Sequence, residues 1–191
     1  MRWLTLYARS RQVPASLAAM VISAVTMWAL AGDGGRGPGD PRLPLLVLAA
    51  GAMSASIGLA GQDSALDRTA AIRWVPRRAA HVLLAAAVVA AILLAVQTLG
   101  KDMTTSAFVV RDSAGLMGLV ALGAVISGRQ YAWTVPFAWL SFTFLAPPAT
   151  SAPMRVAGWM LLPSGTATGT WTALAIAVLG TTAYAVAGPR R

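Results

Sequence analysis

The feature that most constrains the fold is a series of apolar runs, each about 15 to 21 residues long, that recurs along almost the whole chain. A bilayer core of about 30 Å needs roughly 20 helical residues, because a helix rises about 1.5 Å per residue. Only 11% of the residues are charged and 57% are hydrophobic, which leaves little for a soluble domain. We therefore expect one all-α domain over residues 1–191, a polytopic membrane helix bundle with six transmembrane helices. The predicted spans are residues 14–31, 43–61, 79–99, 107–127, 131–145 and 170–187.

The N-terminus precedes the first run and has a different character. Trp3, Leu4 and Tyr7 stand at helical spacing, and three nearby arginines can reach water, so residues 1–14 are predicted to form an interfacial amphipathic helix. A competing interpretation is a cleaved signal peptide, because Ala29-Leu30-Ala31 resembles a small-residue cleavage site after an apolar stretch. Cleavage would leave five spans.

The distribution of basic residues predicts the orientation, because Lys and Arg in short loops collect on the cytoplasmic side. With both termini in the cytoplasm, the larger basic set lies inside: Arg2, Arg9, Arg11, Arg68, Arg73, Arg77, Arg78, Arg129, Arg190 and Arg191. The smaller set lies outside: Arg36, Arg42, Lys101, Arg111 and Arg155. The sequence thus predicts a multi-pass protein of the cell membrane, and its net charge of +9 fits topology and anionic lipid, not nucleic acid.

The polar segment 62–78 interrupts the apolar pattern between the second and third runs. It holds two aspartates four residues apart and two arginines four residues apart, so each pair shares one face of a helix. One interpretation is an ordinary basic cytoplasmic loop. The other is a docking helix for a cytoplasmic partner, with charge complementarity and an aromatic anchor. The predicted docking residues are Asp63, Asp67, Arg68, Arg73, Trp74, Arg77 and Arg78.

Three polar residues at the edges of apolar runs are candidates for a pathway or gating role. His81, the only histidine, lies near the start of the third run and could cap a helix end or relay protons. Arg111 and Asp112 lie near the start of the fourth run, about 6 to 8 Å from its outer end. Because charges in lipid are costly, this pair is expected either to anchor at the outer membrane rim or to line a translocation path.

The stretch 146–169 is too interrupted to cross a bilayer. Its apolar part, residues 156–162, is short and stands between Pro153 and Pro163. Such a piece can form a re-entrant segment if protein covers its backbone; the alternative is an external loop. Trp159 and Met160 favour contact with an apolar surface.

Small residues recur at helical spacing in two of the runs, where they would allow close helix packing within the bundle or between subunits. They are Ala50, Ser54, Gly58 and Gly61 in the second run, and Ala114, Gly118 and Ala121 in the fourth.

The sequence predicts neither an enzyme nor a cofactor. It contains no cysteine and one histidine, and we find no phosphate-binding Gly-rich loop, no His-Glu-x-x-His motif and no nucleophile elbow. We expect no metal site, and any nucleotide hydrolysis would belong to a separate polypeptide.

The order of these features resembles the membrane subunits of type 2 ABC exporters. In that family a coupling helix after span two docks on a separate ATPase, and short re-entrant helices precede span six. Four stretches also look like small actinobacterial integral membrane proteins associated with ABC transporters: Leu66-Asp67-Arg68-Thr69-Ala70, Arg77-Arg78-Ala79-Ala80-His81, Arg111-Asp112-Ser113-Ala114-Gly115-Leu116 and Tyr131-Ala132-Trp133-Thr134-Val135-Pro136. The resemblance implies a permease subunit, in a homo- or hetero-oligomer, whose ATPase partner docks on 62–78.

Two other functions stay open from the sequence. Asp63 and Asp67 could bind Mg²⁺ in a membrane enzyme that acts on lipid or isoprenoid phosphates, although such enzymes usually hold more carboxylates. The chain could also be a non-catalytic scaffold subunit of a membrane complex.

Overall fold

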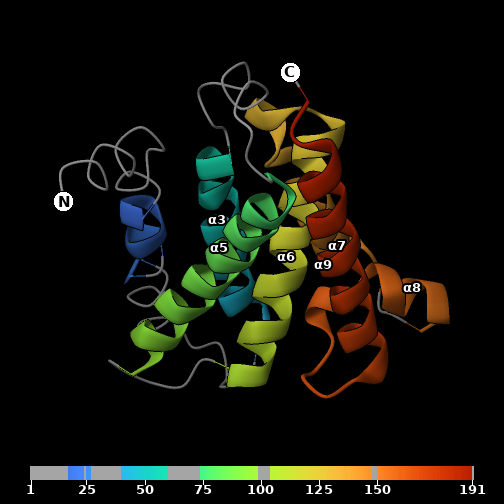
Figure 1. Cartoon of the computed structure of the whole chain (residues 1–191). Helices are drawn as coiled ribbons and strands as arrows, with labels where there is room; N and C mark the ends of the chain where they lie inside the picture. The colour runs from blue at the N-terminus through green and yellow to red at the C-terminus, as the bar shows by residue number, and fades with distance from the viewer. Residues whose placement is uncertain are drawn as a thin grey trace.

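The computed structural model describes residues 17–23, 25–26, 40–59, 74–98, 104–147 and 150–190. Within these ranges the chain is all-helical and contains no strand (Figure 1). Residues 17–23 and 25–26 are helical and belong to the first predicted span. The remaining elements are α3 (Arg42–Leu59), α5 (Trp74–Gln97), α6 (Ser106–Ile126), η1 (Arg129–Tyr131), α7 (Thr134–Leu145), α8 (Ala152–Ala157), η2 (Trp159–Leu161) and α9 (Ala167–Ala187).

Four described helices, α3, α5, α6 and α9, are long and apolar enough to cross a membrane. They correspond to the second, third, fourth and sixth predicted spans, so the expected helical membrane bundle is confirmed at this level. Six spans are not confirmed, because half of the first run lies outside the described residues and the fifth forms a shorter helix.

The fifth run forms α7, whose 12 residues extend only about 18 Å and cannot alone cross a core of about 30 Å. The helix ends at Ala146, which has an extended backbone. The cause is Pro147, since a proline disfavours helical geometry in the residue before it.

Helix α6 is the centre of the bundle and contacts α3, α5, α7 and α9. In its most apolar window 72% of the residues are buried inside the protein, against 33% for α5 and 22% for α9. Protein therefore surrounds α6 on most sides, whereas α5 and α9 turn much of their surface outward.

Helices α6 and α9 run in the same direction along the bundle, and their backbones are in direct contact where they cross. A Cβ built on Gly118 would lie 2.5 Å from the carbonyl oxygen of Ile176, and one built on Gly180 would lie 2.1 Å from that of Gly118. No side chain fits at either position, so the predicted small-residue contact at Gly118 is confirmed as packing within the bundle.

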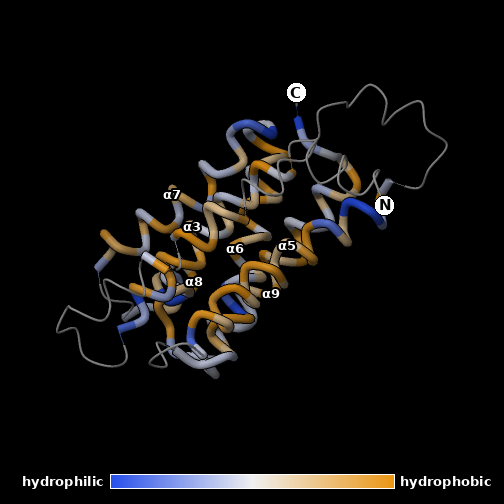
Figure 2. The backbone as a smooth tube through the Cα atoms, turned by 90° about the vertical axis from the view of Figure 1, so that its left-hand side faces the viewer, coloured by the Kyte–Doolittle hydropathy of each residue, from blue (hydrophilic) through white to orange (hydrophobic). Residues whose placement is uncertain are grey.

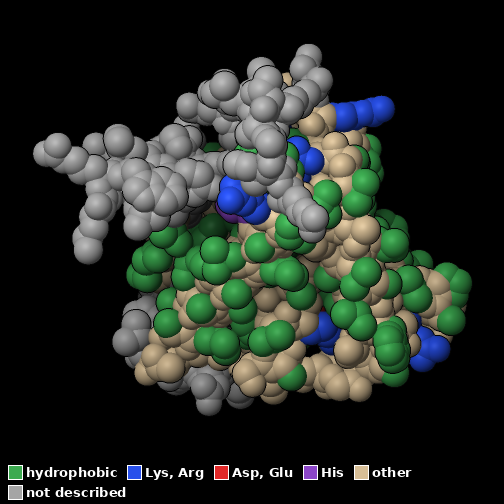
Figure 3. Space-filling model, viewed as in Figure 1, with side chains coloured by type: hydrophobic (Ala, Val, Ile, Leu, Met, Phe, Trp, Pro, Cys, Tyr) green, Lys and Arg blue, Asp and Glu red, His purple; other side chains and the backbone are tan. Residues whose placement is uncertain are grey.

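The surface between the two ends of the bundle is apolar. Exposed hydrophobic side chains include Leu84 on α5, and Trp171 and Val186 on α9, the last two 69% and 68% exposed. Hydrophobic residues predominate in the middle parts of the long helices (Figure 2). Lys and Arg side chains lie nearer the two ends (Figure 3). A soluble monomer rarely exposes so much apolar surface, and together with the four long helices it indicates a membrane protein.

Candidate functional site

The segment between α7 and α9 is a folded structure and not an extended loop. Ser151 caps α8 by accepting a hydrogen bond from the Met154 backbone N–H, and Pro153 occupies the first turn, where its missing N–H costs little. Helix α8 ends at Gly158, and η2 then contacts α3, α7 and α9. Helix α8 itself projects from the side of the bundle (Figure 1).

Trp159 in η2 is fully buried against α6. Atoms of its indole ring would lie 2.3 Å from a Cβ on Gly115, so the ring occupies space that only a glycine leaves open. Met160 beside it is also fully buried. The predicted contact of Trp159 and Met160 with an apolar surface is therefore confirmed.

Arg111 and Asp112 form a buried ion pair near the start of α6. Arg111 donates from Nε to Asp112 Oδ1 at 2.8 Å and from Nη2 to Oδ2 at 3.3 Å. The carboxylate is fully buried and the arginine is 8% exposed. The guanidinium carbon also lies 5.1 Å from the centre of the Phe108 ring, within cation–π range.

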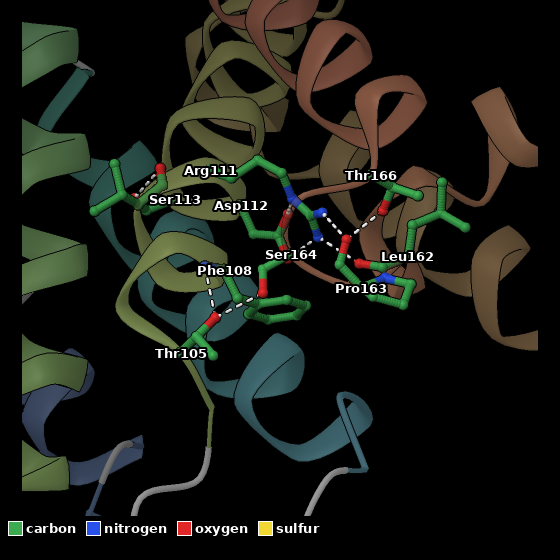
Figure 4. Close-up of polar contacts among 10 residues, drawn as sticks. Thr105, Phe108, Arg111, Asp112, Ser113, Leu162, Pro163, Ser164 and Thr166 are labelled. Carbon is green, nitrogen blue, oxygen red and sulfur yellow. Dashed lines mark hydrogen bonds and ion pairs between the residues drawn. The ribbon is translucent and has the colours of Figure 1, made fainter.

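The same guanidinium group binds the backbone that follows η2. Arg111 Nη2 donates to the Leu162 carbonyl at 2.9 Å, and Nη1 donates to the Pro163 carbonyl at 3.1 Å (Figure 4). We call Arg111, Asp112 and these two carbonyl groups the clamp. Arg111 thus donates to two successive carbonyl groups at the break between η2 and α9. The Pro163 carbonyl also accepts from the backbone N–H and the hydroxyl group of Thr166, so the Leu162 carbonyl depends more strongly on Arg111.

Two further contacts hold residues 157–164 in place. Thr105 Oγ1, which caps α6, donates to Ser164 Oγ at 2.9 Å. Trp139 Nε1 on α7 donates to the Ala157 carbonyl at 2.8 Å. Together with the clamp, they fix the segment to α6 on one side and to α7 on the other.

Replacing Trp139 with Phe tests the second of these contacts. We expect it to destabilise the protein by about 0.6 to 1.5 kcal/mol, because it removes one hydrogen bond and leaves the Ala157 carbonyl unpaired. Thermal unfolding in detergent measures the change. Trp171→Phe is the control, since Trp171 is largely exposed on α9; an equal shift in both variants would contradict the expectation.

The sequence could not reveal the clamp as such. Arg111 and Asp112 stand out as charges in an apolar run, but their partners at Leu162 and Pro163 are backbone atoms about 50 residues away. Gly115 gave no signal either, because its fit to Trp159 depends on how two distant segments meet.

The predicted docking residues lie only partly within the described ranges. Asp63, Asp67, Arg68 and Arg73 lie outside them. Trp74, Arg77 and Arg78 form the start of α5, which corrects the expectation of a separate surface helix through residue 78. The helix continues through Pro76 because a proline in the first turn removes no intrahelical hydrogen bond.

His81 lies one turn further along α5 and faces α3. Its Nε2 is 3.9 Å from the position of a Cβ on Gly58, so the ring lies where these two helices meet. It is not part of the clamp, which lies at the other end of the bundle. The three candidate pathway residues therefore do not form one cluster.

The described residues contain no group of three or more His, Cys, Asp or Glu side chains that could hold a metal ion. No protein-family model matches the sequence, and no curated protein or solved structure is similar to it. Any functional inference therefore depends on the geometry of the chain itself.

Proposed function

We propose that the chain is the membrane-spanning subunit of an ABC-type exporter in the cell membrane, with six crossings and both termini in the cytoplasm. A separate ATPase would dock on residues 62–78, and the permease would be a homo- or hetero-oligomer. The observation that carries the proposal is the folded segment 150–166, which packs Trp159 against α6 immediately before the last long helix. A short folded segment before the last long helix is what the resemblance described above leads us to expect.

The charge at the two ends of the bundle supports the proposed orientation. Arg77, Arg78, Arg129 and Arg190 lie at the end where α5 begins and α9 finishes, and no described acidic residue accompanies them; we call this the basic end. The described charges at the other end are Arg42, Arg111, Arg155, Asp40 and Asp112. The excess of positive charge at the basic end favours its placement in the cytoplasm.

A mechanical route between the two ends follows from the packing. Helix α5 begins within the proposed docking segment, at Trp74, and contacts both α6 and α9. A push on Trp74 and Arg77 would shift α5 against α6, which carries Arg111 at its opposite end. In this proposal, ATPase closure acts on the basic end, and the outer segment 150–166 responds through α6.

Charge reversal tests the docking surface. We expect the double variant Arg73→Glu/Arg77→Glu to lose its ATPase partner, with the amount that copurifies falling about tenfold or more, because like charges across an interface cost several kcal/mol. The control is Arg42→Glu/Arg155→Glu, which changes the same charge at the other end. Membrane insertion should be retained in both variants.

Association that is unaffected by the reversal would contradict the proposal. Mg²⁺-dependent turnover by the purified chain, lost in Asp67→Asn, would instead identify an enzyme acting on lipid phosphates. Tight association without a nucleotide-dependent movement would identify a scaffold subunit.

A further inference from the structure

The chain segment after α9 is fixed across the basic end by backbone hydrogen bonds. The Arg190 N–H donates to the Ala124 carbonyl at 3.0 Å, and the Arg129 N–H donates to the Arg190 carbonyl at 3.4 Å. Gly188 makes the turn with a positive φ of 72°, which few other residues adopt. Residues 188–190, which we call the tail, thus join α9 to the end of α6 and to η1.

Arginines from separate elements gather around this tail. The Arg78 guanidinium group at the start of α5 lies against Gly188, since three of its atoms would lie 2.8 to 3.2 Å from a Cβ built there. Arg190 itself donates from Nη1 to the Ile126 carbonyl at 3.4 Å. Within the described residues neither Arg78 nor Arg190 has an acidic partner, because the one ion pair there is that of the clamp.

Exposed apolar side chains adjoin these arginines. Val186 lies two residues before Gly188 and is 68% exposed, and Ile126, whose carbonyl group binds Arg190, is 59% exposed. Tyr131 and Trp133 are also exposed at this end. Exposed aliphatic side chains beside arginines that have no acidic partner among the described residues, with exposed aromatic residues at the same end, match an amphiphile whose acyl chains adjoin an anionic headgroup.

We propose that the tail region of the basic end binds anionic phospholipid, with Arg78 and Arg190 holding the headgroup phosphate and with Val186 and Ile126 contacting the acyl chains. Arginine suits this role because its planar guanidinium group can donate two parallel hydrogen bonds to phosphate oxygens. A lipid fits this surface better than an acidic protein, since Val186 and Ile126 are exposed aliphatic side chains that acyl chains can cover. Arg78 is therefore assigned here to the lipid and not to the ATPase interface. The inference requires membrane insertion only and does not depend on an ATPase partner.

The experiment uses the purified full-length chain in nanodiscs made from equal amounts of phosphatidylglycerol and phosphatidylcholine. Native mass spectrometry after release measures the ratio of the two lipids that stay bound. We expect the wild type to retain phosphatidylglycerol preferentially, and Arg78→Gln/Arg190→Gln to lower this preference about thirtyfold, because the variant removes two positive charges beside the headgroup. Arg78→Lys/Arg190→Lys, which keeps the charge, should retain most of the preference.

The matched control is Arg42→Gln/Arg155→Gln, which removes the same charge from two exposed arginines at the other end. An equal loss of preference in this control, or no loss in the tail variant, would overturn the proposal. Should Arg78→Gln/Arg190→Gln fail to fold, the wild type in rising salt gives the second measurement. A preference unchanged between low and high salt would then also overturn the proposal.

Discussion

Replacing Arg111 with Met is expected to destabilise the protein by about 3 to 5 kcal/mol, the usual cost of removing one member of a buried ion pair. The variant leaves the Asp112 carboxylate buried without its partner, and it removes the donor of the Leu162 carbonyl. The Pro163 carbonyl loses Arg111 but keeps its hydrogen bonds to Thr166. Unfolding in detergent measures the loss of stability. Limited proteolysis should show faster cleavage within residues 150–166, because the clamp holds this segment to α6.

The control for this prediction is Arg155→Met, which removes an exposed arginine from α8 at the same end of the bundle. The double variant Arg111→Met/Asp112→Leu should recover part of the loss, since it removes the unpaired carboxylate but still leaves the Leu162 carbonyl without its donor. If Arg111→Met is no less stable than Arg155→Met, the clamp does not stabilise the fold.

Gly180→Ala is expected to destabilise the bundle by about 3 kcal/mol, at the upper end of the usual cost of overpacking. The new methyl group would lie 2.1 Å from the Gly118 carbonyl oxygen, and a backbone atom cannot turn aside as a flexible side chain can. Helices α6 and α9 would have to separate along their contact. Gly118→Ala should behave similarly, and thermal unfolding in detergent measures both.

The control is Gly58→Ala, in the last turn of the long apolar helix α3. Its nearest neighbour would be His81 Nε2 at 3.9 Å, an ordinary contact distance. We expect this variant to be neutral or more stable by up to about 1 kcal/mol, because alanine favours the helix more than glycine does. Equal destabilisation at positions 58 and 180 would show that the close crossing is not the cause.

Hydropathy predicted the four long helices because each one consists largely of a continuous apolar run. A helix that crosses lipid needs such a run, so its sequence alone reveals it. The start of α5 differs from the prediction. The helix begins at Trp74, five residues before the expected start, because Pro76 is tolerated in a first turn. The fifth run, residues 131–145, ends where α7 ends, but only its last 12 residues form that helix. Apolar composition predicts burial or lipid contact, but it does not set the length of a helix.

The candidate site was predictable as a set of residues but not as an arrangement. Trp159 stood out because a large aromatic residue in a short apolar piece needs a partner, and the structure supplies Gly115. The ion pair stood out because charge is costly in lipid. The carbonyl partners of Arg111 could not be predicted, since backbone carbonyl groups carry no sequence signature. The docking residues Asp63, Asp67, Arg68 and Arg73 lie outside the described residues.

The central position of α6 has a consequence for biogenesis. When α6 leaves the ribosome, the segment that satisfies Arg111 and the helix that receives Gly118 have yet to be synthesised. At that stage Arg111 and Asp112 can pair only with each other, and the guanidinium group gains its carbonyl partners when residues 162 and 163 arrive. Completion of the packing around α6 therefore depends on the last quarter of the polypeptide.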